Sequence, residues 1–481
     1  MMGKKFRIKS HIAKKTKKNM VLWQKEEERH CTAFFLLIFF CFLAFQSISA
    51  FAKETEEAKA IQLGTSGIES PSAVWVGNTI EDDMPCYYYN PSDYIYFGMN
   101  ENIPIKWRVL DAYHANDKAS SGMFLLSEYV LERQVVFEKN HSEDDGDGQR
   151  YRDDWQHSDA QKWCSTFAQN TEKFTMGEQA AMLGIEKYDD SENNLWRSDW
   201  RENYLTEEEK LFFLSSREIV DYVGNYYGAP GLAATDVRGK ATMWWLRSSY
   251  GNPEIYYGKV AECAGVVRAE GYIEFDNIFL GLGARPGMNL NSNTVLFISD
   301  AERGKMDFRV DENLTKVGVG GMDWKLTLID SSRSFYVNER ELETAAGDIV
   351  CLAYFGAKKG NEEYVSAMIA DSSSRIVYYG RIAKDHEEGM AYITIPSDLT
   401  PGNYTLKVFS EQYNGEEGTD YASEFSDVSL LVYKNVTIQP GDTLWELSQK
   451  YNCTVAEIVS MNERLIENQD RILAGWIVKI P

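Results

Sequence analysis

The C-terminal stretch of residues 436–481 constrains the fold of this 481-residue chain more tightly than any other segment. Two Thr-x-x-Glu capping boxes begin there, at Thr443 and Thr454, and each predicts the start of a helix. Apolar residues follow both boxes at helical spacing, and short β-type runs flank them at residues 436–438 and 477–480. We therefore expect a strand, two helices and a strand, with the two strands paired over the apolar helix faces.

These motifs, in this order, closely resemble a LysM domain. The matching features are the Gly441-Asp442-Thr443-Leu444 turn, Tyr451, the Glu457-Ile458 pair, Asn462, and an ending that runs from Gly475 to Ile480-Pro481. The resemblance implies binding of N-acetylglucosamine-containing glycans, chiefly peptidoglycan or chitin. In that family the sugar lies in a shallow groove between the loop after the first strand and the loop before the second.

The resemblance implies that these two loops hold the glycan-binding residues. The candidates in this sequence are Gly441, Asp442, Thr443, Leu444, Asn462, Ile472 and Leu473. Backbone amides and small aliphatic side chains would hold the N-acetyl group of this neutral polar ligand. Trp445, beside the first loop, would either stack on a sugar face or cap the small core. The alternative for the whole segment is a domain that keeps the LysM fold but has lost its ligand.

Residues 1–52 have the composition of an export signal. A basic part at residues 1–31 is followed by an almost wholly apolar run at residues 32–52, which ends in the small-x-small site Ala50-Phe51-Ala52. We expect a cleaved signal peptide. The alternative is an uncleaved membrane anchor over residues 32–52, with its positive end inside the cell. Both interpretations place the remainder outside the cytoplasm, in the cell wall or the extracellular space.

The charge of the exported remainder argues against nucleic acid as a partner. The chain has 50 basic and 73 acidic residues, and residues 1–52 hold ten and three of them, so residues 53–481 carry 40 against 70, or −30. Nucleic-acid binding needs clustered positive charge, which this excess of carboxylates opposes. Residues 53–73 are acidic and form a predicted linker.

The cysteines and histidines indicate no metal site and no cofactor. The five cysteines beyond residue 52 are scattered, with no CxxC pair: Cys86, Cys164, Cys263, Cys351 and Cys453. Their odd number leaves at least one thiol free or paired between chains. The histidines show no zinc-ligand spacing. Residues 143–148 are acidic and Gly-rich like a calcium loop but lack the acidic residue at loop position twelve, so we interpret them as a solvated loop.

Residues 74–298 form the largest predicted domain. Within it, a strand-like run at 211–214 leads directly into a helix, whose start is predicted by the capping box of Ser215 with Glu218. A Trp-Trp-Leu-Arg-Ser motif at 244–248, a Gly-Ala-Arg-Pro motif at 283–286 and a strand-like run at 107–110 resemble an uncharacterised bacterial extracellular domain family. That family is distantly similar to formylglycine-generating domains, so the resemblance implies a C-type-lectin-like α+β fold and no particular activity. The candidate ligand contacts are Trp244, Trp245, Arg247 and Arg285. The competing interpretation is that these tryptophans pack in the core and these arginines are buried with satisfied hydrogen bonds.

No catalytic residue is assigned in this domain, and we expect a non-catalytic protein. Neither an HExxH nor a GxSxG motif occurs in the chain. Formylglycine generation relies on two neighbouring cysteines, and Cys263 has no such neighbour in sequence. The main alternative is a cell-wall-modifying or sulfatase-maturation-like enzyme housed in residues 74–298. His157 and Cys164 are then the pair whose geometry must be judged.

Residues 300–434 have the pattern of an all-β domain. Strand-type runs occur at 324–328, 348–354 and 428–432, and a Pro401-Gly402 turn leads into an alternating strand at 404–408. The polar cluster at residues 371–374 is interpreted as a turn. The last pattern resembles the penultimate strand of a bacterial immunoglobulin-like sandwich, and that resemblance implies a spacer or adhesive module.

The sequence therefore predicts a multidomain protein. Its parts are a C-type-lectin-like α+β domain, an all-β immunoglobulin-like sandwich and a C-terminal βααβ LysM domain. The predicted function is non-covalent binding of peptidoglycan or chitin-type glycans at the cell envelope. Besides the enzyme alternative, a structural or adhesion protein without any small ligand stays open.

Overall fold

The structure of the chain is a computed structural model that divides into two compact units, residues 1–57 and 58–481. All the described residues belong to the second unit. They are residues 61–63, 68, 72–78, 85–90, 93–112, 115–116, 120–139, 155–187, 194–195, 208–224, 232–250, 254–256, 259–261, 263–302, 304–305, 309–317, 321–467 and 472–481.

Several predicted features lie outside the described residues. They are the signal or anchor segment at 1–52, the start of the acidic linker at 53–60 and the acidic stretch at 143–148. Within the described part of the chain, no helix is both long enough and apolar enough to cross a bilayer. Residues 61–63 of the predicted linker form a strand, β1 (Ile61–Leu63), which pairs antiparallel with β16 (Val295–Asp300).

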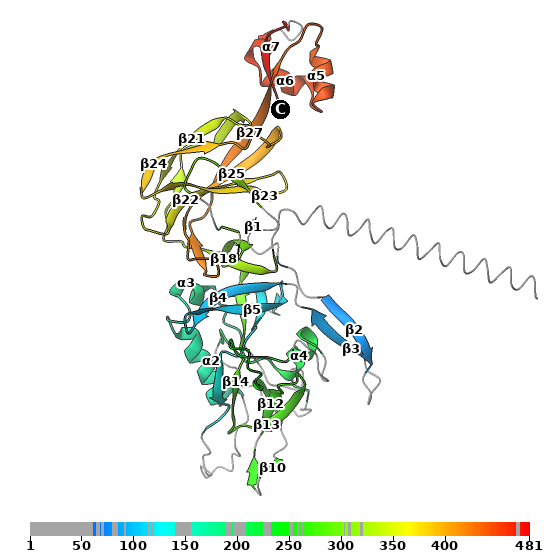
Figure 1. Cartoon of the computed structure of the whole chain (residues 1–481), viewed down its shortest axis with the longest axis vertical. Coiled ribbons are helices and arrows are strands. Elements are labelled where there is room, and N and C mark those ends of the chain that lie inside the picture. Colours follow the sequence, from blue (N-terminus) through cyan, green and yellow to red (C-terminus); the bar gives the residue numbers. More distant parts are fainter. Residues whose placement is uncertain are drawn as a thin grey trace, which may run out of the picture. The chain divides into compact units, whose positions relative to one another are not determined.

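The described chain is mostly β-sheet, with few and short helices (Figure 1). Two sheets build the central part. One has the strand order β15-β7-β5-β4 and continues into β18 (Asp323–Ile329), and the other has the order β13-β12-β9-β14-β8. Their bounds are β4 Tyr94–Asn100, β5 Ile103–Asp111, β7 Ser120–Ser127, β8 Glu132–Val136, β9 Trp244–Ser249, β12 Cys263–Val267, β13 Ile273–Asn277, β14 Gly281–Ala284 and β15 Gly287–Asn291. The smaller strands are β2 Ser72–Asn78, β3 Pro85–Asn90, β6 Ala115–Asn116, β10 Glu254–Tyr256 and β11 Lys259–Ala261.

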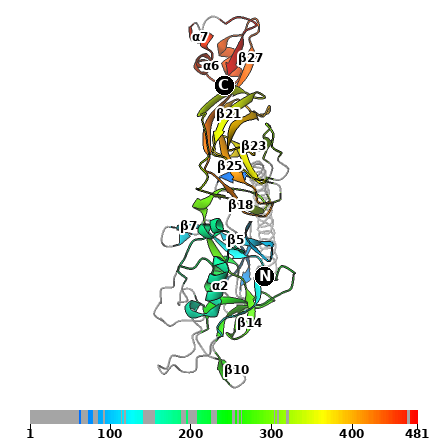
Figure 2. The ribbon, with the colours of Figure 1, turned by 90° about the vertical axis from the view of Figure 1, so that its left-hand side faces the viewer.

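Short helices pack against these sheets, and side-chain caps fix where they begin. Helix α2 (Asp159–Gln169) begins at Ser158, whose side chain accepts a hydrogen bond from the Gln161 amide, and it packs against β8. Figure 2 shows α2 in the same part of the molecule as β5 and β14. The capping box predicted at Ser215 is confirmed as the start of α4 (Ser216–Tyr222). The strand predicted just before it is wrong, because that segment makes only a single bridge, from Phe212 to Gly287. The other helices here are α3 Met176–Ala181, η1 Trp155–His157 and η2 Ser292–Thr294.

The predicted sandwich region has two sheets facing one core. The first contains β23, β22, β25 and β27, and the second has the order β19-β21-β24. Apolar side chains from both sheets form the core between them: among others Val350, Leu352, Ile393, Val365, Leu406, Val408 and Leu430. The bounds are β17 Thr315–Lys316, β19 Tyr336–Val337, β20 Glu341–Ala345, β21 Ile349–Phe355, β22 Glu363–Ala370, β23 Ile376–Lys384, β24 Glu388–Thr394, β25 Gly402–Gln412, β26 Asp420–Ala422 and β27 Ser426–Thr437.

The strand predictions for this region are confirmed. The runs at 324–328, 348–354 and 428–432 fall on β18, β21 and β27, and the turn at 371–374 joins β22 to β23. One assignment differs in its surroundings. Strand β18 pairs in parallel with β4 of the central sheet, and its Trp324, Leu326 and Leu328 pack in the central core.

The C-terminal unit is confirmed as strand, helices and strand. Strand β27 runs on from the sandwich to Thr437, and β28 (Ile477–Ile480) pairs antiparallel with its end. Both predicted capping boxes are present at the starts of α5 (Leu444–Lys450) and α6 (Val455–Ser460). A short third helix, α7 (Glu463–Glu467), was not predicted. The unit has its own core: Ile438, Leu444, Leu447, Ile458, Leu465, Val478 and Ile480.

Candidate functional site

Two loops of the C-terminal βααβ region lie next to each other, at the end of the paired strands β27 and β28. The Ile438 amide donates to the Trp476 carbonyl oxygen at 2.7 Å, and the Gly475 amide donates to the Ile438 carbonyl oxygen at 2.8 Å. The chain departs from this ladder at 439–443 on one side and arrives at 472–475 on the other. These two segments are therefore neighbours. Five of the seven predicted glycan-binding residues lie in them, a sixth, Leu444, directly follows the first segment, and the seventh is Asn462.

Local hydrogen bonds shape the first loop. The Asp442 carboxylate accepts from the Gln439 amide at 2.7 Å, and the Asp442 amide donates to the Gln439 carbonyl oxygen at 3.1 Å. Gly441 has φ +97°, a left-handed conformation that favours glycine, and a Cβ there would meet open space. The Thr443 hydroxyl caps α5, and the Leu444 side chain is buried in the core. The side chains of this loop thus hold its shape, while a ligand would meet mainly its backbone.

The second loop supplies the aliphatic surface. Leu473 is 44% exposed, and Ile472 is half-buried and packs against the C-terminal core. Gly475 has φ +87°, and the Trp476 amide donates to the Leu473 carbonyl oxygen at 3.1 Å, which closes the turn. Beside the first loop, Trp445 is 66% exposed. Between these two options for Trp445, this exposure favours contact with a ligand over capping of the core.

Asn462 joins α6 to β28. Its side-chain amide donates to the Ile458 carbonyl oxygen at 2.7 Å and to the Lys479 carbonyl oxygen at 2.8 Å. Its side-chain oxygen accepts from the Lys479 amide at 2.9 Å. All these contacts are internal, so the structure gives Asn462 a role in holding the second strand in place behind the loops.

The candidate contacts of the central domain lie in its core. Trp244, Trp245 and Arg285 are fully buried, and Arg247 is 1% exposed. Each indole nitrogen donates to a backbone carbonyl oxygen, that of Leu232 for Trp244 at 3.1 Å and that of Val135 for Trp245 at 2.7 Å. In this arrangement none of the four presents a surface to a ligand. Their burial matches the competing interpretation from sequence, but its satisfied hydrogen bonds hold only in part, because Arg285 Nη2 has no hydrogen-bond partner among the described residues.

Arg247 is part of a buried ion cluster. It donates to the Phe213 carbonyl oxygen at 2.9 Å and contacts Glu218, which also accepts from Lys187 Nζ at 2.9 Å. Burial alone would raise the pKa of the Glu218 carboxyl, but these two cations lower it well below its ordinary range. The cluster anchors α4 to β9.

The cysteine of the enzyme hypothesis is placed unfavourably for catalysis. Cys164 lies on the buried face of α2, and burial raises the pKa of its thiol well above the ordinary value. A reactive cysteine needs a lowered pKa and access to substrate. The Cys164 thiol forms no disulfide. Among the described residues, no group of acidic, histidine and cysteine side chains is arranged to hold a metal ion.

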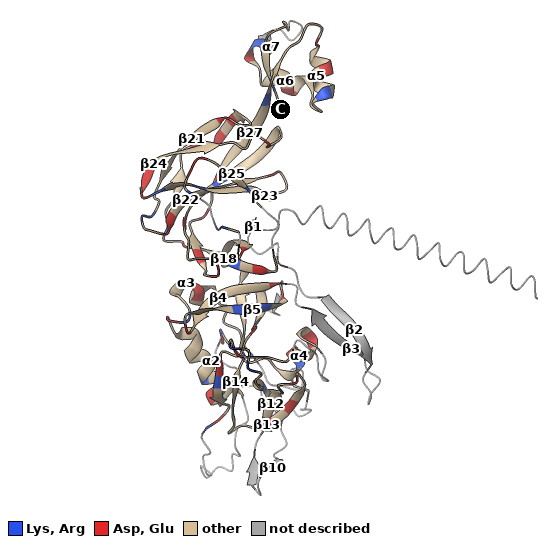
Figure 3. Cartoon of the chain, viewed as in Figure 1, with Lys and Arg blue, Asp and Glu red and all other residues tan. Residues whose placement is uncertain are grey.

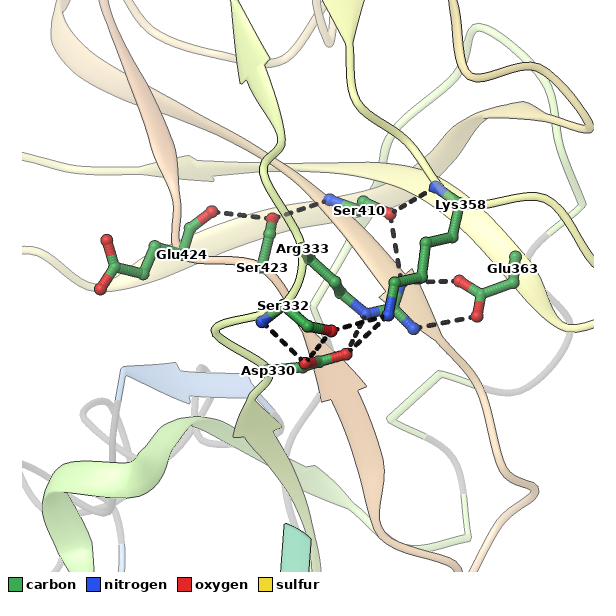
Figure 4. Close-up of polar contacts among 8 residues, drawn as sticks. All are labelled: Asp330, Ser332, Arg333, Lys358, Glu363, Ser410, Ser423 and Glu424. Atoms are coloured by element: carbon green, nitrogen blue, oxygen red, sulfur yellow. Dashed lines mark hydrogen bonds and ion pairs between the residues drawn. The ribbon is translucent and has the colours of Figure 1, made fainter.

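A polar cluster at one end of the sandwich was not anticipated from sequence (Figure 4). The guanidinium of Arg333 pairs with both oxygens of Glu363 at 2.6 and 2.9 Å and with Asp330 at 3.1 Å. Lys358 Nζ donates to Asp330 at 2.9 Å. The turn after β18, residues 330–333, is thus tied to β22, and a cavity of about 590 Å³ lies beside it. Because the charges of this cluster are matched and bonded to one another, we assign it a structural role.

Two family models match the chain. One is described as the LysM domain and matches residues 436–481, and the other as a domain of unknown function (DUF6273) and matches residues 120–292. No curated protein matches this chain. The first match confirms the LysM prediction, and LysM domains bind N-acetylglucosamine-containing glycans such as peptidoglycan or chitin. The second covers the central region but gives neither a fold nor an activity.

Proposed function

We propose that this protein is an exported, non-catalytic cell-envelope protein that binds peptidoglycan through its C-terminal LysM domain. The observation that carries the proposal is the LysM match at residues 436–481, together with the two adjacent loops that leave the β27–β28 ladder. The N-terminal sequence pattern supports export, and the absence of a catalytic motif in the sequence supports the binding role.

The chemistry of the two loops suits a neutral sugar. The first loop offers backbone from Gly441 to Thr443, and the second offers the exposed aliphatic side chain of Leu473. Amide groups pair with an N-acetyl group, and apolar side chains cover the methyl group and ring. One such shallow site binds weakly. Repeated sites in oligomers, or a membrane anchor at residues 32–52, would strengthen retention on the wall.

The other two domains are proposed to space and present this binding unit. We assign residues 300–434 to an immunoglobulin-like sandwich, supported by the two facing sheets and their shared core. We assign the central domain to a C-type-lectin-like fold, supported by the combination of short helices with two sheets around the buried Trp244 and Trp245.

Retention on insoluble peptidoglycan tests the proposal. Residues 53–481, which include the whole compact unit 58–481, are compared with the same chain lacking residues 436–481. We expect the deletion to abolish sedimentation with the polymer. If both forms are retained equally, binding resides elsewhere; if neither is retained, the domain has lost its ligand. Either outcome overturns the proposal.

A point variant locates the site within the domain. Leu473→Ser removes the exposed aliphatic side chain of the second loop and should weaken retention about tenfold, the factor expected for losing one well-placed apolar contact. Ile477→Ser is the matched control, because Ile477 is 67% exposed and lies on β28 outside the two loops. An equal loss of retention in both variants would argue against a glycan site at the two loops.

A further inference from the structure

The central domain contains a cavity that is lined by none of the residues of the two LysM loops. Its volume is about 700 Å³, within the ~300–1,000 Å³ range of small-ligand sites. Four segments line it: the β4–β5 turn, residues 130–133 at the start of β8, residues 163–173 on and after α2, and the turn at 236–240. These segments are far apart in sequence, so only the fold brings them together.

One wall of the cavity is aromatic. Trp163 and Phe167 of α2 line it, with their ring centroids 4.9 Å apart. Trp163 is half-buried, and its indole nitrogen donates to Glu132 at 2.7 Å, which fixes the orientation of the ring. A half-buried indole beside polar groups is a typical surface for a sugar ring, since such a ring has an apolar face of C–H groups and hydroxyl groups around its rim.

The carboxylates of the cavity already have partners. The Asp236 carboxylate is buried, contacts Arg133 at 3.0 Å and accepts from the backbone amides of Arg238 and Lys240. Glu132 accepts from the indole of Trp163. Glu101, in the β4–β5 turn, lies 3.8 Å from Arg238, and both of those side chains are largely exposed.

The cations of the cavity outnumber its carboxylates by four to three. Lys173 donates to a neutral group, the side-chain oxygen of Asn100, at 2.7 Å. Lys240 is exposed, and its described contact with Asp236 is through the backbone amide. Asp and Glu occur along the whole described ribbon (Figure 3), so a locally positive cavity runs against the composition of the chain. A ligand carboxylate would satisfy this charge.

We propose that this cavity binds an acid sugar of one or two rings, with a ring against Trp163 and a carboxylate between the ammonium groups of Lys173 and Lys240. N-acetylmuramic acid, which is N-acetylglucosamine bearing a lactyl carboxylate, has this chemistry. The inference deepens the proposed function, because such a sugar belongs to the same wall polymer, but it concerns a different domain and different residues.

Calorimetric titration tests the inference with three probes: N-acetylmuramic acid, N-acetylglucosamine and lactate. Residues 53–481 are titrated alongside the same chain lacking residues 436–481, so that sugar binding at the proposed LysM site is subtracted. We expect N-acetylmuramic acid to bind at least about tenfold more tightly than either of the others, the factor for one charge-assisted hydrogen bond to a partly exposed group. This preference should shrink as salt is raised, because the carboxylate and the lysines are screened.

A double variant assigns the preference to the cavity. Lys173→Gln with Lys240→Gln should bring the affinity for N-acetylmuramic acid down to that for N-acetylglucosamine. The control is Lys162→Gln, on the same helix, because Lys162 is 62% exposed and does not line the cavity. Equal binding of the two sugars by the unaltered chain, equal binding of lactate and N-acetylmuramic acid, or an unchanged preference in the double variant would each overturn the inference.

The two proposals fail separately. Loss of peptidoglycan retention on deleting residues 436–481 concerns the LysM domain alone. The carboxylate preference and its removal by the double variant concern only residues of the central domain. A chain that binds the acid sugar but not the polymer would keep this inference and refute the proposed function.

Discussion

Removal of one cation from a fully buried charge cluster in residues 300–434 is the sharpest test of how this fold is held together. Lys305 and Lys325 lie there with Glu411 and Asp420, and all four side chains are at most 1% exposed. Lys305 Nζ donates to Glu411 at 2.7 Å and to Asp420 at 2.8 Å, and Lys325 Nζ donates to Asp420 at 2.9 Å. Two cations balance two carboxylates, so the cluster is neutral.

Lys305→Met would leave two buried carboxylates with one cation. Breaking a buried pair by removing one partner costs about 3–5 kcal/mol, because the remaining charge keeps its desolvation penalty. Glu411 still accepts hydrogen bonds from Ser366 at 2.5 Å and from Tyr379. We therefore expect a loss near the lower end, about 3 kcal/mol of unfolding free energy at neutral pH.

The loss should depend on pH in a defined direction. Burial alone would raise the pKa of the Glu411 carboxyl, but the Lys305 ammonium holds it below its ordinary value. A carboxyl with a lowered pKa contributes stability above its unfolded pKa and loses that contribution as the pH falls. The difference between the wild type and Lys305→Met is therefore largest at neutral pH and shrinks in acid.

Urea unfolding of residues 53–481, followed by tryptophan fluorescence, measures this loss as a lower midpoint at constant slope. Lys359→Met is the control, because Lys359 and its partner Glu387 are both more than half exposed, and we expect a change below ~0.5 kcal/mol. Adding Glu411→Gln to Lys305→Met should recover part of the loss, since the charges are then balanced again. A loss below ~1 kcal/mol for Lys305→Met, or a double variant no more stable than the single, would refute this reasoning.

Two further predictions concern single polar side chains. Burial raises the pKa of the Glu209 carboxyl to about 7, although hydrogen bonds from Trp155 and Gln161 act in the opposite direction. Between about pH 4.5 and 7 the folded chain therefore binds more protons than the unfolded chain, and its free energy of unfolding falls by up to ~3 kcal/mol as the pH rises. The stability of Glu209→Gln relative to wild type should therefore increase from pH 5 to pH 8 in urea unfolding, and a difference independent of pH would contradict this. Asn462→Ala removes the three hydrogen bonds that join α6 to β28 and should lower the stability of this contact by about 1–3 kcal/mol. Hydrogen exchange at the Lys479 amide should then be faster, and unchanged protection of this amide would contradict the prediction.

Local signals gave the most reliable predictions. The capping boxes at Thr443, Thr454 and Ser215 each join residues three apart, so the hydrogen bonds that start these helices can be predicted from a short stretch of sequence. A strand such as the one at 404–408 can be predicted from its alternating apolar and polar residues, because neighbouring side chains point to opposite faces of a sheet. The LysM domain was therefore recognisable in 46 residues, with its order of elements and its two loops.

Burial of particular side chains could not be read in the same way. Trp244 and Arg247 lie in a motif that suits either a ligand surface or a core, and only the packing of β9 between β12 and β14 buries them completely. The LysM resemblance implied a ligand contact at Asn462, yet its hydrogen-bond partner Lys479 lies 17 residues away on β28.

The sequence alone was sufficient for the helix starts at Ser215, Thr443 and Thr454, the strands predicted in residues 300–434, the C-terminal LysM domain and the excess of negative charge, because these depend on residues that are neighbours in the chain or on composition. The tertiary structure decided where distant charges meet. Lys305 reaches Glu411 across 106 residues, and the cavity combines Trp163 with a turn at 236–240. Such contacts form only after sheets have paired, since strand pairing fixes which side chains share a face, and no local pattern encodes that choice.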